Sequence, residues 1–257
     1  MNNFLLQPYR TESGLAGGMR QPADAVRASM PTLPAQAACL IVDAREYAAG
    51  GFGIRLLMES HLEAVIDGLI LAAYACGAEL GYIFVSGRYP LIWRNLQTII
   101  RERREMGMLG TRIFGTKFNF DMEARLDVMG EGSDALLLSQ LAGRLLPPST
   151  QPADRGMAIV SVVEVIRLAQ GWAAAKPPQM SETRLVAVSG ATEHPGLYEI
   201  AAVGELKEVF TAVGVDADCV VQIEGAGPCY SVAEVVSGEM KLPQTNPLNL
   251  VVVEKPV

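Results

Sequence analysis

The sequence predicts an α/β protein in which a parallel sheet with covering helices precedes a smaller, strand-rich part. Two short apolar runs, 39–42 and 81–85, have the composition of buried parallel strands. A helical pattern of apolar residues fills 61–75 between them and ends at Gly77, and a second helix begins at Tyr89-Pro90. The order strand, helix, strand, helix is typical of a parallel α/β layer.

Composition excludes several classes of protein. The 257 residues are 50% hydrophobic and 19% charged, which suits a chain with a large core. The net charge of −7 argues against binding to nucleic acid, which requires clustered Lys and Arg. The N-terminal residues lack the pattern of a signal peptide, and acidic residues interrupt the apolar stretches before they reach membrane-spanning length. We therefore expect a cytoplasmic protein with no membrane insertion.

The cysteines and histidines predict no metal site. The 4 cysteines form no CxxC pair, and the 2 histidines complete no known zinc or iron–sulfur spacing. Neither histidine belongs to a recognisable Ser/His/Asp or Cys/His set. We therefore predict no metal and no hydrolytic site.

The first two parts of the predicted organisation are an irregular segment and an α/β domain. Residues 1–37 contain scattered Pro and Gly, so we expect irregular structure with one short helix around 23–29. We assign residues 38–180 to the α/β domain.

Three further elements are expected within this α/β domain. Apolar and polar residues alternate over 118–128, which predicts a long, half-exposed strand. Ser133-Asp134 suits the start of a helix that runs to Ala142, and the apolar stretch from Met157 to Trp172 predicts a further helix.

The remaining part, residues 181–257, follows a β-grasp plan. The predicted order is two strands, a helix, a strand and a closing strand, at residues 184–189, 197–200, 205–213, 219–223 and 248–253. Because the pattern changes after Lys176-Pro177-Pro178, we place the domain boundary near residue 180.

Several long segments carry a resemblance to a known family. RLLMESHLEAVIDGLILAAYACGAELGYIFVSGRYP (55–90) and MLGTRIFGTKFNFDMEARL (108–126) resemble the FMN-carrying, NADH-oxidising 51 kDa subunit of respiratory complex I and related diaphorase subunits. VSGATEHPGLYEI (188–200) is similar to the soluble-ligand-binding β-grasp (SLBB) domain that follows the flavin domain there. The resemblance implies a Rossmann-like flavin domain, FMN and NAD(H) as cofactors, and other oxidoreductase subunits as partners.

The two N-terminal cofactor motifs of this family are altered in the chain. Of the glycine-rich loop that cradles the FMN phosphate, the pair Gly17-Gly18 remains. The motif C-N-A-D-E-x-E-P-G corresponds to residues 42–50, where Asp43 replaces an amide, Arg45 reverses an acidic charge and Glu46 is retained. An ionised aspartate only accepts hydrogen bonds, so complementarity to a flavin is reduced.

The other two cofactor motifs are also altered. Y-I-C-G-E-E-T-A-L corresponds to residues 128–136, where Gly130 and Glu131 survive out of register. V-N-N-V-E-T-L corresponds to residues 160–166, where Ser161 and Val162 replace the two amides. The sequence ends at Val257, before the family's iron–sulfur domain, so the resemblance implies no onward electron path within these residues.

We therefore predict a non-catalytic paralogue of the flavin subunit, with no catalytic residue and no cofactor, that acts as a structural or interaction subunit of an oxidoreductase assembly or self-associates. The alternative is an active NADH/FMN diaphorase module that passes electrons to a partner subunit, and a third hypothesis is a small-ligand sensor built on the β-grasp domain. The family-matched candidates for cofactor binding are Gly17, Gly18, Asp43, Glu46, Gly130, Glu131 and Ser161.

The predicted boundary leads to a proteolysis experiment. Limited digestion of the purified chain should cut first between Gln170 and Thr183, because Lys176 and the following prolines are typical of an exposed linker. Mass spectrometry of the early fragments locates the cut. First cleavage within 184–257 would contradict the boundary or show that the linker is buried.

Overall fold

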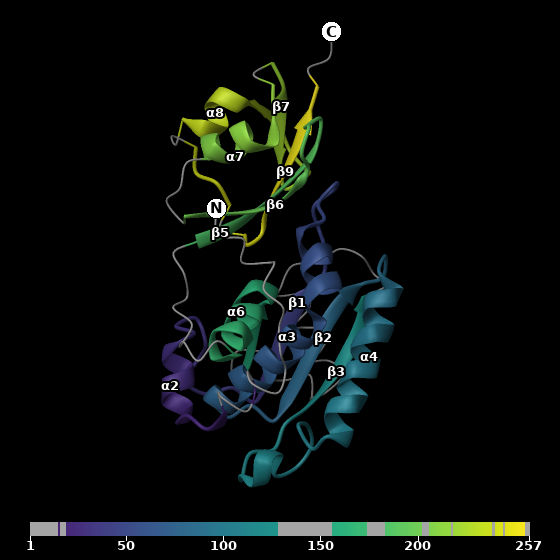
Figure 1. The fold of residues 1–257 in the computed structure, drawn as a ribbon, viewed down its shortest axis with the longest axis vertical. Coiled ribbons are helices and arrows are strands. Elements are labelled where there is room, and N and C mark those ends of the chain that lie inside the picture. Colours follow the sequence, from purple (N-terminus) through teal and green to yellow (C-terminus); the bar gives the residue numbers. More distant parts are fainter. Residues whose placement is uncertain are drawn as a thin grey trace, which may run out of the picture. The chain divides into compact units, whose positions relative to one another are not determined.

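The computed structural model describes Leu15 and residues 19–127, 156–173, 183–201, 206–216, 218–237, 240–243 and 245–254 (Figure 1). The chain divides into two compact units, which we describe separately. The first, the α/β unit, comprises residues 9–45 and 58–180. The second, the β-grasp unit, comprises residues 1–8, 46–57 and 181–257.

A parallel sheet of four strands forms the centre of the α/β unit. Its strands are β1 (Cys39–Ala44), β2 (Leu80–Ser86), β3 (Asp121–Asp127) and β4 (Met157–Ser161), in the order β3-β2-β1-β4. The accompanying helices are α2 (Ala23–Ala28), α3 (Gly53–Cys76), α4 (Pro90–Glu105), the 3-10 turn η2 (Ile113–Gly115) and α6 (Val162–Ala173). The parallel α/β prediction is confirmed.

Helix α3 makes two kinds of close contact with its neighbours. At Gly68 a β-carbon would lie 1.9 Å from the carbonyl oxygen of Val165 on α6, so only glycine allows this approach of the two helices. On the α4 side, Arg103 Nε donates to Asp67 Oδ1 at 3.0 Å, and its Nη2 donates to Glu63 Oε2 at 3.1 Å. The Asp67 side chain is fully buried, so this ion pair fixes α4 against α3 in the core.

The structure corrects two expectations in this unit. The stretch 157–172 is not one helix, because residues 157–161 form β4 and pair with β1 along its length. A buried strand and a buried helix give similar apolar runs, so the pattern alone could not separate them. The strand expected at 118–128 is shorter, Asp121–Asp127, and parallel to β2. The helix expected at 133–142 lies outside the described residues, and α2 confirms the one expected near residue 23.

The β-grasp unit contains a mixed sheet of five strands. Its elements are β5 (Thr183–Gly190), β6 (Gly196–Ala201), α7 (Leu206–Val213), β7 (Val220–Ile223), β8 (Cys229–Ser231), α8 (Val232–Val236) and β9 (Leu248–Val253). The strand order is β6-β5-β9-β7-β8, and β5 and β9 are parallel while the other neighbours are antiparallel. This is the predicted β-grasp plan.

Strand β8 and helix α8 were missed. Ser231 and Glu234 form a capping box at the start of α8, and this Ser-x-x-Glu spacing was a readable signal.

Side chains of α4 bind the backbone of the outer strand β3. Trp93 Nε1 donates to the Ala124 carbonyl oxygen at 3.0 Å, and Arg104 Nη2 donates to that of Met122 at 2.7 Å. The Met122 amide donates to Asp121 Oδ1 at 2.8 Å. Backbone groups of an edge strand otherwise offer a template for another chain, so α4 closes this edge to strand addition.

Removing these contacts should promote aggregation. Trp93→Phe deletes one bond to β3, and Arg104→Met deletes two, since Arg104 Nε also donates to Asp121 Oδ1 at 2.9 Å. Each lost bond costs about 0.5–1.5 kcal/mol, and each variant exposes an edge carbonyl. We expect faster aggregation on mild heating, measured by light scattering. Arg101→Met, at an exposed position of the same helix, is the matched control and should behave as the unmodified chain. Equal aggregation of Arg104→Met and Arg101→Met would contradict the assigned role.

Candidate functional site

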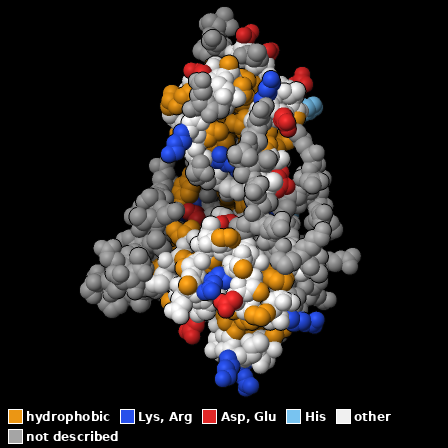
Figure 2. Space-filling view, turned by 90° about the vertical axis from the view of Figure 1, so that its left-hand side faces the viewer, with side chains coloured by type: hydrophobic (Ala, Val, Ile, Leu, Met, Phe, Trp, Pro, Cys, Tyr) orange, Lys and Arg blue, Asp and Glu red, His pale blue; other side chains and the backbone are white. Residues whose placement is uncertain are grey.

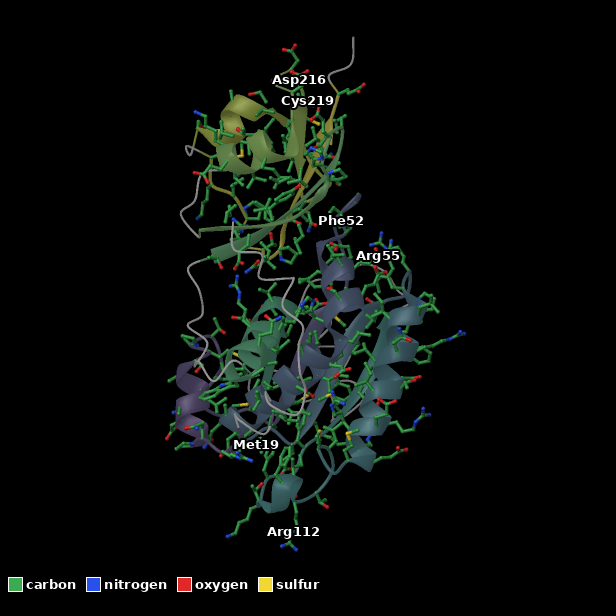
Figure 3. All side chains as sticks on the ribbon, viewed as in Figure 1. Met19, Phe52, Arg55, Arg112, Asp216 and Cys219 are labelled. Atoms are coloured by element: carbon green, nitrogen blue, oxygen red, sulfur yellow. The ribbon has the colours of Figure 1, made fainter. Side chains whose placement is uncertain are left out.

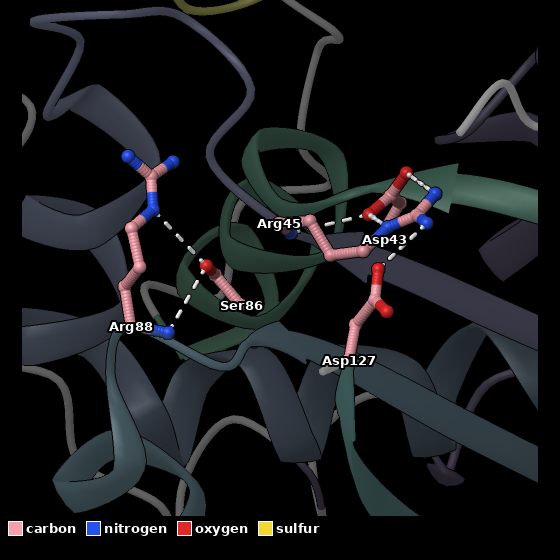
Figure 4. Close-up of polar contacts among 5 residues, drawn as sticks. All are labelled: Asp43, Arg45, Ser86, Arg88 and Asp127. Atoms are coloured by element: carbon pink, nitrogen blue, oxygen red, sulfur yellow. Dashed lines mark hydrogen bonds and ion pairs between the residues drawn. The ribbon is translucent and has the colours of Figure 1, made fainter. Parts of the chain in front are cut away.

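The carboxyl edge of the parallel sheet is the expected ligand site of an open α/β fold. Ligands bind such sheets outside the carboxyl ends of the strands, at the point where the strand order reverses. In the order β3-β2-β1-β4 the reversal lies between β1 and β4, whose carboxyl ends are Ala44 and Ser161. Polar and charged residues lie at the carboxyl ends of the strands: Ser161 follows β4, and Figure 4 shows Asp43, Arg45, Ser86, Arg88 and Asp127.

Arg45 holds two carboxylates together at this edge. Its Nε and Nη2 donate to the two oxygens of Asp43, each at 2.8 Å, and its Nη1 donates to Asp127 Oδ2 at 3.1 Å (Figure 4). The side chains of Arg45, Asp43 and Asp127 are 5%, 12% and 11% exposed. Because β2 separates β1 from β3, the guanidinium group bridges two non-adjacent strands at the carboxyl end of β2. Buried charges are tolerated when they are paired in this way.

A second arginine lies beside this network. The backbone amide and Nε of Arg88 donate to Ser86 Oγ at 3.3 and 3.4 Å. In Figure 4 the end of the Arg88 side chain points away from Arg45 and the two aspartates. The edge therefore presents one buried arginine, Arg45, and one exposed arginine, Arg88.

Ser161 begins the next helix. Its Oγ accepts from the Glu164 amide at 3.1 Å, and its own amide donates to Glu164 Oε2 at 3.0 Å, which is a capping box. Thr32 Oγ1 donates to Glu164 Oε1 at 2.6 Å, and Val162 is fully buried. Both the hydroxyl and the amide of Ser161 are used by α6 itself.

Glu46 belongs to the other unit. It is 3% exposed, and its Oε2 accepts from the amide of Ile54 at 2.9 Å, in the first turn of α3. A carboxylate at a helix N-terminus is stabilised by the unpaired amides and by the helix dipole. The division of the chain falls between Arg45 and Glu46, so Asp43 and Glu46 are assigned to different units.

Four of the seven candidate residues for cofactor binding cannot be placed. Gly17, Gly18, Gly130 and Glu131 lie outside the residues that the structure describes. Sequence reasoning noted Arg45 only as a charge reversal and did not select Asp127 at all. The sequence contains a signal for this network, because Asp43 and Asp127 both lie at the ends of predicted strands and Arg45 follows Asp43 by two residues.

Burial shifts the pKa of two side chains elsewhere in the described part of this unit. Burial raises the pKa of the Cys39 thiol to about 12, which keeps it protonated. Burial lowers the pKa of His61, whose Nδ1 lies 2.7 Å from Ser60 Oγ at a kink in α3. Within the ranges that the structure covers, no three His, Cys, Asp or Glu residues are grouped as metal ligands, and no helix is long and apolar enough to cross a membrane.

The surface view shows how charge is distributed on one face. Lys and Arg side chains alternate with Asp and Glu on the face drawn in Figure 2, without an extended basic area among the residues it colours. This distribution differs from the clustered positive charge that nucleic-acid binding requires.

Replacing Arg45 should destabilise the α/β unit. Arg45→Met removes the cation that two nearly buried carboxylates share, and breaking a buried pair costs about 3–5 kcal/mol. The matched control is Arg125→Met, because Arg125 pairs with Glu123 at the surface, where the loss is about 0–1 kcal/mol. Denaturant unfolding of both variants measures the difference. Equal losses would show that the Arg45 network contributes no more than a surface pair.

Comparisons with known proteins agree with this fold. A 30% identical relative, the NAD-reducing hydrogenase HoxS subunit alpha of Cupriavidus necator, aligns over 79% of this chain and 36% of its own length. A subunit of the NADH-quinone oxidoreductase of Escherichia coli is 31% identical over 63% of this chain and 40% of its own length. The chain thus spans well under two thirds of these relatives.

A solved structure gives the same result for the fold. The NAD+-reducing [NiFe]-hydrogenase in the H2-reduced state aligns with a TM-score of 0.65 at 23% identity, over 95% of this chain and 45% of that chain. The sequence profile of the Nuo51 FMN-binding domain matches residues 14–169. The chain therefore belongs to the complex I 51K family, the family of the Nuo51 FMN-binding domain.

Proposed function

We propose that this chain is a non-catalytic member of its family, which serves as a structural or interaction subunit of an oxidoreductase assembly. The observation that carries the proposal is the ion network of Arg45 with Asp43 and Asp127 at the carboxyl edge. At an edge where a ligand would need donors, the three nitrogens of this arginine already donate to the protein's own carboxylates.

Among the residues that the structure describes at this edge, Asp43, Arg45 and Asp127 are a poor match for FMN. The flavin phosphate is an anion and the ring carbonyls accept hydrogen bonds, so the cofactor requires donors. Three N–H groups of Arg45 are directed at Asp43 and Asp127, and the amide of Ser161 donates to Glu164, so FMN would have to compete with the protein's own carboxylates for these donors. Two nearly buried aspartates would also repel the phosphate. This mismatch supports a chain that has kept the framework of the family and lost the cofactor.

The alternative is an active NADH/FMN diaphorase module with altered ligands. One observation favours it: the family match covers the entire α/β core, with every strand of the parallel sheet. A module of this kind would pass electrons to a partner subunit. The altered charges at Asp43 and Arg45 would then require a different set of contacts to the flavin.

The visible absorption spectrum distinguishes the two functions. We expect the purified chain to carry no flavin absorbance, and to bind no FMN in equilibrium dialysis at micromolar concentrations. The Escherichia coli relative, purified and dialysed in the same way, is the reference. One equivalent of FMN retained through purification would exclude the non-catalytic proposal and favour the diaphorase.

The proposed assembly has its own test. Chain purified gently from its native cell extract should migrate in native mass measurements as part of a larger complex, with oxidoreductase subunits or with further copies of itself. A free monomer under these conditions would contradict an interaction role, whatever the flavin content.

A further inference from the structure

The β-grasp sheet buries one face fully and the other in part. One face packs under α7 and α8 with Val186 and Val188 of β5 and with Leu248, Leu250 and Val252 of β9. Side chains alternate along a strand, so the residues between these point to the other face. There Ala187 pairs with Asn249 and Ser189 pairs with Val251. We call these four residues the platform.

Two of the four platform residues are buried although they lie opposite the helices, and Ser189 and Val251 are half-buried. Ala187 is 2% and Asn249 is 4% exposed. The covering segment is residues 46–53, which we call the strap and which belongs to the same unit. Phe52 and Arg55, labelled in Figure 3, mark the place where the strap continues into the first turn of α3.

Glycines let the strap lie directly on the platform. A β-carbon added to Gly50 would lie 3.3 Å from Val251 Cγ2. A β-carbon added to Gly53 would lie 2.6 Å from Pro247 Cγ and 3.1 Å from the β-carbon of Ala187. A β-carbon on Gly51 would lie 3.0 Å from Asn249 Oδ1. The carbonyl oxygen of Gly50 also accepts from Ser189 Oγ at 3.0 Å. The platform thus contacts the backbone of the strap at positions where glycine leaves room for close approach.

The turn after β7 contacts the other side of the strap, and we call its residues Glu224 and Gly225 the corner. A β-carbon on Gly225 would lie 1.9 Å from the carbonyl oxygen of Ala49. The preceding Glu224 has a φ of 55°, in the left-handed region. Its carboxylate holds that conformation, because Oε2 accepts from Asn249 Nδ2 at 3.1 Å and Oε1 accepts from the hydroxyl of Thr245 at 2.5 Å. Asn249 therefore links the corner to the platform.

We propose that the platform and this corner form a peptide-binding surface whose resident ligand is the chain's own strap. The ligand class that this face recognises is then a glycine-rich peptide backbone. The strap includes residues 46–50 of the segment that corresponds to the family's second cofactor motif, and the proposal rests only on contacts within the β-grasp unit. It makes residues 46–53 an integral part of the β-grasp unit, although they follow β1 in the chain.

Two glycines of one turn provide a matched test. Gly225 and Gly227 both have a positive φ, of 62° and 83°, so an alanine is strained at either position. The methyl group of an alanine at position 225 would meet Ala49 of the strap. The methyl group of an alanine at position 227 would have no atom within 4 Å. In the full chain, hydrogen exchange of amides in 46–54 should accelerate about tenfold or more in Gly225→Ala relative to Gly227→Ala. Equal exchange in the two variants, or an unprotected strap in the unmodified chain, would overturn the proposal.

A peptide added in trans tests the binding surface itself. Gly53→Val disrupts the strap against Pro247 and Ala187 and leaves the platform intact. A fluorescent peptide of residues 46–57 should bind the Gly53→Val variant. It should not bind the unmodified chain, because the chain's own strap fills the platform. It should also not bind the double variant Gly53→Val, Gly225→Ala. Fluorescence anisotropy measures the binding. A Gly53→Val chain with a released strap that fails to bind the peptide would also overturn the proposal, as would equal binding to all three proteins.

Discussion

The α/β unit depends on the pairing of charges that its fold brings out of water. Arg45 pairs with Asp43 of β1 and Asp127 of β3, and Arg103 of α4 pairs with Asp67 and Glu63 of α3, so each of these two arginines joins separate elements. Taking charged groups out of water is costly unless each meets an opposite charge with good geometry. The first network joins β1 to β3 at the carboxyl edge, and the second joins α3 to α4. The arrangement of strands and helices is therefore fixed by charge as well as by apolar burial.

The same constraint limits what the carboxyl edge can bind. A guanidinium group with its donors directed at two carboxylates has little left to offer an anionic ligand. The amide of Ser161 is likewise directed at Glu164, as part of the capping box of α6. The fold is that of the FMN-binding domain, while the charged groups described at this edge pair with one another.

Close backbone approach is the second organising feature. Gly68 admits α6 against α3, and Gly225 admits the strap against the corner of the β-grasp sheet. In both places the partner atom is a carbonyl oxygen of a residue far away in the chain, Val165 or Ala49. Within its own segment each of these glycines looks like an ordinary helix or turn residue. The need for glycine comes from the distant partner.

The sequence by itself determined the α/β class, the order of most elements and the β-grasp plan, because apolar periodicity and turn residues act over short stretches of chain. It also identified the family through long segments of similar residues. Tertiary structure alone decided that 157–161 is a strand, since the neighbour β1 supplies its hydrogen bonds. It alone paired Arg45 with Asp127 and assigned Glu46 and the strap to the β-grasp unit. These contacts join residues that lie far apart in the chain, and no local pattern encodes which distant groups will meet.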